Sequence, residues 1–117
     1  MGTSALIAYR NDDGQTYNIN TINFDGYLEG VGSKLINYYD SLEQAKKLVN
    51  SNDIRGLENS YEETEFYPKK SPFLRKRKNL TFEELCNEAG NYSYTYVYED
   101  DLWQLLDKRN DYYMSPI

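Results

Sequence analysis

The chain has 117 residues, a length that fits one domain able to bury a core without disulfide bonds. It contains no histidine and a single cysteine, Cys86. These counts exclude Cys/His zinc sites, histidine-activated nucleophiles and an intrachain disulfide. We therefore expect a protein that is not an enzyme and that uses neither a metal nor a cofactor.

The charge is unevenly distributed along the chain. The net charge is −6, from 13 basic and 19 acidic residues. Six of the basic residues fall between positions 69 and 78, which leaves 7 basic against 19 acidic residues elsewhere, a balance of −12. An acidic body repels nucleic acid and attracts basic protein surfaces. We therefore expect a protein partner and no direct binding of nucleic acid.

The composition also predicts a cytoplasmic protein. No apolar run approaches the length needed to cross a bilayer, and Met1-Gly2-Thr3 does not begin a signal peptide. A single cysteine gives no sign of an oxidising compartment. We expect no membrane partner.

The first predicted element is a hairpin. Residues 4–10 read as a strand with a continuous apolar run at 5–8, an Asp-Gly turn follows, and residues 15–24 return antiparallel to the first strand. The stretch 24–32 then holds three glycines and marks the change from strand-like to helix-like spacing.

Two helices are predicted after this change. Apolar residues recur at helical spacing from Val31, and a second helix begins at Ser41, where Ser41 and Gln44 form a capping box. Residues 50–53 end the second helix. The two helices are separated by Asp40.

The segment 59–79 is the longest piece without periodicity. It holds Pro68, Pro72 and the six clustered basic residues. A loop of this length in a small domain is usually functional or disordered, so we expect this basic loop to be mobile. Its lysines and arginines either contact phosphates, with Tyr67 and Phe73 available for base stacking, or balance the acidic body in solvent. We favour the second interpretation.

A third helix and a second hairpin complete the chain. Thr81 and Glu84 form another capping box. Strands follow over 92–98 and 102–106, and 107–117 read as a polar tail. Tyrosines at 92, 94, 96 and 98 would share one strand face. That face either packs in the core or offers a stacking platform, and we favour packing, with Ser93, Thr95 and Val97 facing solvent.

Together these patterns predict one α+β domain over residues 1–117. We expect an antiparallel sheet of about four strands, formed by the two hairpins, with two or three helices packed on one face.

Two hypotheses concern the stretch 24–32. Asp25 and Glu29 are four residues apart, which allows a Mg²⁺ or acid-base role, although Asp25-Gly26 is also an ordinary turn. The glycines at 30 and 32 resemble a phosphate-binding helix start, but the order of Lys34 and Ser33 is not that of a P-loop. Turn formation and close backbone packing are the favoured interpretations.

The chain resembles a group of small phage and prophage proteins. The shared motifs are short and spread along the sequence: Met1-Gly2-Thr3, Phe24-Asp25-Gly26-Tyr27, Val31-Gly32, Asp53-Ile54 with Leu57, and the segment from Tyr96 to Trp103. The group often has histidine just before the aromatic residue, where this chain has Asn23. The resemblance implies a phage accessory role in the host cytoplasm, and it supplies no reaction.

From the resemblance and the charge we expect stoichiometric binding to a host protein. The partner would be a nucleic-acid-binding defence protein that the acidic surface inhibits, as anti-CRISPR proteins do. The first expected contacts are Asp25, Tyr27 and Glu29, and the second are Lys69, Lys70, Arg75, Lys76, Arg77 and Lys78. The alternative is a small-ligand module that holds or sequesters a nucleotide or phosphate at the glycine-rich helix start.

Overall fold

The computed structural model describes residues 2–117, and Met1 of the Met1-Gly2-Thr3 motif lies outside the described residues. Both predicted hairpins are present. Strands β1 (Ala5–Arg10) and β2 (Thr16–Ile22) pair antiparallel, as do β6 (Tyr94–Glu99) and β7 (Leu102–Asp107). The turn between β6 and β7 is Asp100-Asp101, with φ of 54° and 65°. Aspartate tolerates this left-handed conformation, which matches the twist of a tight hairpin.

The hairpins meet in a mixed sheet, so the predicted four-stranded antiparallel sheet is wrong. β1 pairs parallel with β6, from Ala5 opposite Tyr94 to Tyr9 opposite Tyr98. The sheet has eight strands in the order β4-β3-β2-β1-β6-β7-β8, and β5 also pairs with β2. The additional strands are β3 (Ile54–Gly56), β4 (Glu65–Phe66), β5 (Leu80–Thr81) and β8 (Tyr113–Pro116).

The last strand corrects a second expectation. The predicted polar tail forms the 3-10 turn η2 (Lys108–Asn110) and then β8, which pairs antiparallel with β7. Strands as short as β3, β4 and β5 carry too few residues to show an alternating pattern in the sequence.

The helices follow the predicted start signals. A π-helical turn η1 (Leu28–Gly32) leads into α1 (Ser33–Tyr38), and α2 (Leu42–Val49) begins where the Ser41 side chain accepts from the Gln44 N–H. Helix α3 (Phe82–Ala89) begins with a complete capping box between Thr81 and Glu84.

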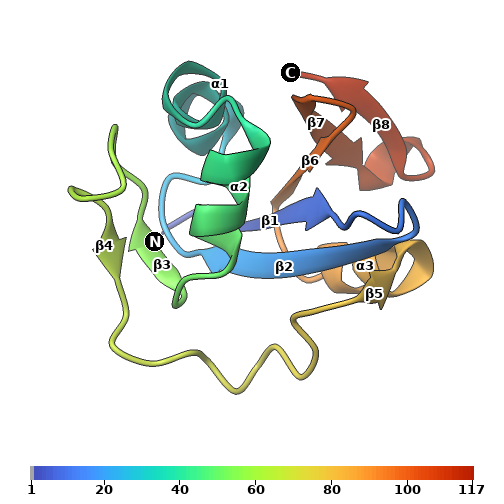
Figure 1. The fold of residues 1–117 in the computed structure, drawn as a ribbon, viewed down its shortest axis with the longest axis horizontal. Helices are drawn as coiled ribbons and strands as arrows, with labels where there is room; N and C mark the ends of the chain where they lie inside the picture. The colour runs from blue at the N-terminus through green and yellow to red at the C-terminus, as the bar shows by residue number, and fades with distance from the viewer. Residues whose placement is uncertain (1) are drawn as a thin grey trace.

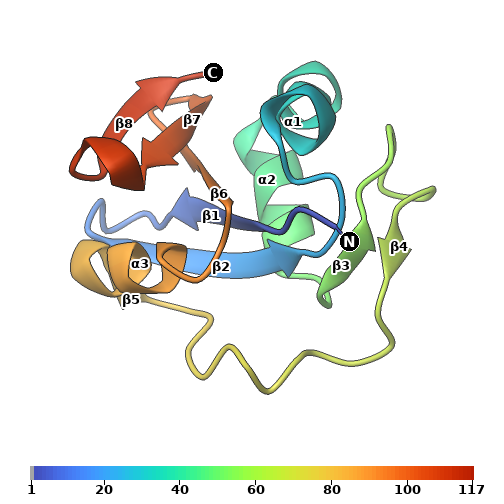
Figure 2. The same ribbon diagram turned by 180° about the vertical axis from the view of Figure 1, so that it is seen from behind.

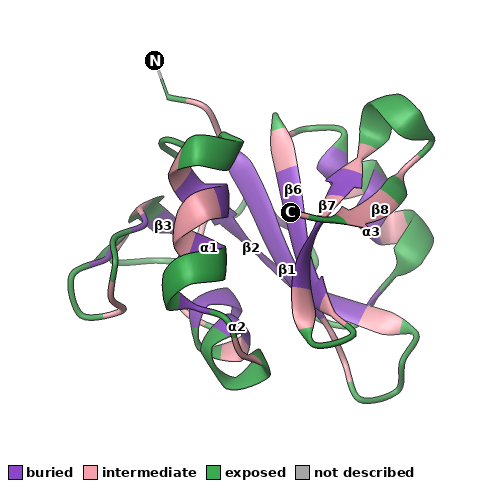
Figure 3. Ribbon diagram, turned by 90° about the horizontal axis from the view of Figure 1, so that it is seen from above, coloured by how far each residue is buried: buried purple, intermediate pink, exposed green. Residues whose placement is uncertain are grey.

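These helices cover both faces of the sheet, so the expectation that they pack on one face is wrong. Helices α1 and α2 lie on one face and α3 on the other (Figures 1 and 2). Alternate residues of β1 serve the two cores: Ala5 and Ile7 pack with α1 and α2, whereas Leu6 and Ala8 pack with α3. The central strands are consequently buried on both sides (Figure 3), which explains the continuous apolar run at 5–8.

The tyrosine ladder is a core feature only in part. Tyr96 and Tyr98 are buried in the core beneath α1 and α2, as predicted. Tyr92 precedes β6 and packs against the opposite core. Thr95 and Val97 were expected to face solvent, but both are buried because α3 covers their side of the sheet. Within residues 2–117, no helix is both long enough and apolar enough to cross a bilayer.

Candidate functional site

The loop before η1 is held by backbone and side-chain hydrogen bonds from three parts of the chain. The buried hydroxyl of Tyr96 donates to the carbonyl oxygen of Gly26 at 2.6 Å, and the Gly26 N–H donates to the Thr3 oxygen at 2.8 Å. The N–H of Val31 donates to the Asp25 oxygen at 2.9 Å. Asp25 has a φ of 58°, so the chain turns sharply here. The loop is therefore fixed in one shape by the sheet below it.

This fixed loop displays apolar and acidic side chains together. Phe24, Tyr27 and Leu28 are 38–39% exposed, and so is Ile36 of α1, which lines a shallow groove with Leu28. Asp25 and Glu29 are exposed between them in the sequence. We call this set the aromatic–acidic surface: Phe24, Asp25, Tyr27, Leu28, Glu29 and Ile36. The three first-choice contact residues from the sequence all belong to it.

The glycines of this region serve packing. A methyl group on Gly30 would run into the backbone oxygen of Asp25, and one on Gly32 would touch Leu28 and Tyr96 at 3.4 Å. The N–H groups of residues 30, 31 and 32 donate to backbone oxygens within the loop. These groups are therefore not free to bind a phosphate, and the small-ligand hypothesis has no support at this position.

The six clustered basic residues divide into two groups. Lys76 pairs with Glu84 at 3.0 Å, and Arg77 pairs with Asp53 at 2.5 Å. Within residues 2–117, the other four are exposed and form no ion pair: Lys69, Lys70, Arg75 and Lys78. Only these four are available for a partner without breaking an existing contact.

Arg77 joins three separate segments. Its guanidinium donates to Oδ1 of Asp53, to Oδ1 of Asn20 on β2 at 3.1 Å, and to the backbone oxygen of Ser71 at 3.1 Å. Its own backbone oxygen accepts from the N–H of Ile19 at 2.8 Å. The side chains of Arg77 and Asp53 are only 15% and 6% exposed. Arg77 thus fills the edge of β2 between the residues of β2 that pair with β5 and the residue that pairs with β3. The sequence predicted that Arg77 contacts a partner, whereas in the structure its side chain binds within the chain.

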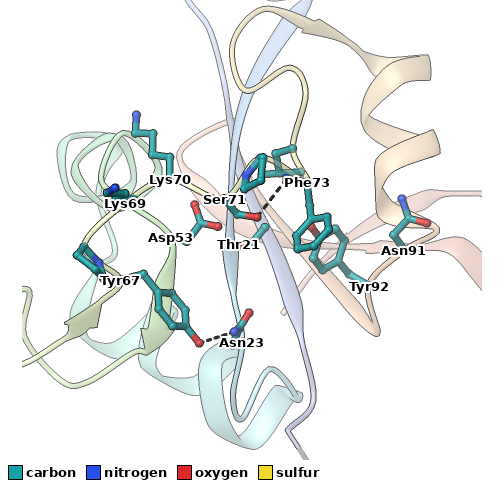
Figure 4. Close-up of a pocket in the computed structure, with 13 residues that line it drawn as sticks. Thr21, Asn23, Asp53, Tyr67, Lys69, Lys70, Ser71, Phe73, Asn91 and Tyr92 are labelled. Carbon is teal, nitrogen blue, oxygen red and sulfur yellow. Dashed lines mark hydrogen bonds between the residues drawn. The ribbon is translucent and has the colours of Figure 1, made fainter.

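A cavity of about 770 Å³ lies beside this ion pair. It is open to solvent and is lined by the segment 67–74, which we call the arch, together with β2 and the turn after α3 (Figure 4). Tyr67 stands at one side of it, with Phe73 and Tyr92 at the other. The Tyr67 hydroxyl accepts from Nδ2 of Asn23 at 2.5 Å. Lys69 and Lys70 also line the cavity.

Burial and the negative charges of Glu88 and Asp53 raise the pKa of Tyr92 to about 12. The sequence indicated Tyr67 and Phe73 beside the basic loop, and Tyr92 only as part of a separate tyrosine face. It gave no sign that Tyr92 and Asn23 lie beside them, because tertiary contacts bring these residues to the cavity.

A second group of carboxylates gathers at one end of the sheet. Because β1 and β6 are parallel, the turns that follow them lie at the same end. They bring together Asp12, Glu99, Asp100 and Asp101 around one surface hollow. Arg10 in the same hollow pairs with Glu99 at 3.3 Å and with Asp100 at 2.7 Å. Asp25 and Glu29 follow the end of β2 and lie at the opposite end of the sheet.

No group of three or more His, Cys, Asp or Glu side chains among residues 2–117 is arranged to hold a metal ion. Cys86 is a buried free cysteine of α3, and burial raises the pKa of its thiol. A thiol in such surroundings is less reactive than an exposed one.

Comparison with protein-family models, with curated proteins and with solved structures finds no match. The surfaces of the chain itself are therefore the basis for assigning a function.

Proposed function

We propose that the protein is a phage accessory protein that binds a host protein stoichiometrically through its aromatic–acidic surface. The observation that supports this most directly is the fixed loop at 24–29. It exposes Phe24, Tyr27 and Leu28 beside two carboxylates, and its backbone is tied to Thr3 and Tyr96. Aromatic side chains surrounded by polar ones are typical of the residues that dominate binding energy in protein interfaces.

The fixed shape of the loop favours binding. An interface formed by a flexible loop loses affinity because its side chains and backbone must be ordered on association. Here the tertiary hydrogen bonds of Gly26 and the local bond between Val31 and Asp25 order the backbone before a partner arrives. The surface can therefore present its aromatic rings without that ordering cost.

The charge of the molecule selects the chemistry of the partner. The net charge of −6 and the carboxylates at both ends of the sheet complement a basic surface. Basic surfaces of this kind hold nucleic acid in many host proteins, including defence nucleases, so occupation by an acidic protein would inhibit them. The second contact is provided by the four basic residues without an ion pair, which are Lys69, Lys70, Arg75 and Lys78. Lys76 and Arg77 already have intramolecular partners.

The test is a pull-down from host lysate followed by calorimetry with the recovered protein. We expect one dominant partner that binds with one-to-one stoichiometry. The double variant Asp25→Lys/Glu29→Lys should weaken binding at least about tenfold, because like charges then face each other across the interface. The matched control is Glu43→Lys/Glu83→Lys, which makes the same charge change at two exposed positions outside both groups of carboxylates.

Two results would contradict the proposal. One is recovery of no protein by the unmodified chain. The other is equal weakening by both double variants, which would mean that overall charge and not the aromatic–acidic surface determines binding.

A further inference from the structure

We infer that the cavity beneath the arch binds a small molecule with a planar ring and a phosphate group, of the nucleotide class. This site is separate from the aromatic–acidic surface, although Lys69 and Lys70 belong both to it and to the second contact proposed for the protein partner. Its volume of about 770 Å³ lies within the range of small-molecule sites, roughly 300–1,000 Å³.

The wall of the cavity that the arch forms is anchored at three points. The arch is attached at Ser71, whose backbone oxygen accepts from Arg77, and Leu74 is buried in the core beneath α3. Asn52 also holds the start of the arch, since its side-chain amide donates to the backbone oxygen of Tyr67 at 3.0 Å. These contacts anchor the arch to the fold at Tyr67, Ser71 and Leu74, and the residues between the anchors are exposed.

The rings around the cavity suit a planar group. Tyr67, Phe73 and Tyr92 line it, and Phe73 is 88% exposed, the most exposed of the large hydrophobic side chains between residues 2 and 117. Stacking on aromatic side chains is the usual way to bind a nucleobase, and it tolerates different bases. A ligand ring stacked there would cover Phe73.

The charges around the cavity favour an anion. Asp53 is the one carboxylate among its lining residues, and Arg77 neutralises it. Lys69 and Lys70 form no ion pair within the part of the chain that the structure describes, so the lining carries excess positive charge on an acidic protein. Lysine ammonium groups bind phosphate as point charges, and the amides of Asn23 and Asn91 can bond the edge of a base.

The test uses AMP as the probe, with adenosine and ribose 5-phosphate as partial probes. Calorimetry and thermal shift should show that AMP binds the full-length chain and raises its melting temperature, whereas each partial probe binds at least about tenfold more weakly because it lacks one recognised group. Lys69→Ala/Lys70→Ala should weaken AMP binding about tenfold or more and should reduce its salt dependence. Phe73→Ala should weaken AMP and adenosine but not ribose 5-phosphate.

Two variants serve as controls. The basic control is Arg75→Ala/Lys78→Ala, which removes two exposed charges outside the cavity lining and should leave AMP binding unchanged. The variant Asp25→Lys/Glu29→Lys should also bind AMP normally, so failure of the protein-binding proposal and failure of this one are distinguishable. Absence of binding for AMP, GMP, CMP and UMP at millimolar concentration would overturn the inference. Equal loss of AMP binding in the cavity pair and in the basic control pair would also overturn it.

Discussion

Arg77 is the residue on which the arrangement of the arch depends most. It satisfies the buried carboxylate of Asp53, the amide oxygen of Asn20 and a backbone oxygen of the arch. A buried charge that loses its partner is strongly destabilising, whereas an exposed ion pair contributes little. Lys76 and Arg77 are neighbours in the sequence, but the ion pair of Lys76 is half-exposed and that of Arg77 is buried. The contributions of an exposed and a buried pair to stability can therefore be compared directly.

We expect Arg77→Met to lower the free energy of unfolding by about 3–5 kcal/mol, because Asp53 is left buried and unpaired. Lys76→Met removes a half-exposed pair with Glu84 and should cost about 0–1 kcal/mol. Urea denaturation of both variants measures the difference. Equal losses would show that the Arg77 pair is no more important to stability than a surface pair.

The double variant Arg77→Met/Asp53→Leu gives a further check at the same site. Replacing both members of a buried pair by apolar residues leaves no unpaired charge, so it should recover part of the stability lost by Arg77→Met alone. A double variant less stable than Arg77→Met would contradict this account.

Among the elements, the basic loop at 59–79 is less uniform than its sequence suggests. Its first part forms β4, which pairs with β3, and its later part contributes the buried Leu74 and the Arg77 contacts. Between these anchors, Lys69, Lys70, Pro72 and Phe73 are exposed. Mobility of the loop as a whole stays a prediction, and these residues are where we expect it to be greatest.

Limited trypsin digestion tests this prediction. We expect the first cuts after Lys69 and Lys70, because cleavage requires local opening and the arch has few buried apolar contacts there. Arg77→Met should speed these cuts by releasing the arch at Ser71. Mass spectrometry of the early fragments identifies the sites. First cuts in α2, after Lys46 or Lys47, would contradict the prediction.

The sequence predicted the elements that local chemistry specifies. Capping residues marked the starts of α2 and α3, and turn residues marked both hairpins. It could not show the parallel pairing of β1 with β6, because that contact joins the two ends of the chain and leaves no local pattern. The continuous apolar run at 5–8 was the one available sign that both faces of the sheet are covered.

The residues of the candidate sites also divide into those that the local sequence indicates and those that only tertiary contacts reveal. Asp25, Tyr27 and Glu29 could be proposed as contacts because they are close together in the sequence, and the structure places all three at the surface. The partners of Arg77 lie at Asp53 and Asn20, far away in the sequence, so the cluster of basic residues gave no sign that Arg77 is internal. Tyr92 reaches the cavity from the turn after α3 for the same reason.

At the scale of the whole molecule, buried tyrosines determine the response to alkaline pH. Burial raises the pKa of Tyr17, Tyr39, Tyr96 and Tyr98, and it raises that of Tyr92 to about 12. In the unfolded chain a tyrosine ionises near its ordinary pKa of about 10. Above that pH the unfolded state releases protons that the folded state keeps, so the free energy of unfolding must fall as pH rises.

We expect stability to be insensitive to these groups below about pH 9 and to fall above about pH 10. Each tyrosine with a raised pKa lowers the free energy of unfolding by up to about 1.4 kcal/mol per pH unit, until the tyrosine ionises in the folded state as well. Tyr96→Phe should make the slope shallower by about that amount, while costing about 1 kcal/mol at neutral pH through the lost bond to Gly26. Urea denaturation from pH 8 to 11 measures both effects, and an unchanged slope in Tyr96→Phe would contradict the assignment.

The position of β1 in the sheet has a consequence for synthesis of the protein. β1 precedes the other strands of this sheet in the chain, yet it lies between β2 and β6, and β6 is translated much later than β1 and β2. Until residues 94–98 emerge, the nascent hairpin has an open apolar strand edge of the kind that pairs with other chains. The two hairpins can therefore join into one sheet only after β6 has been translated.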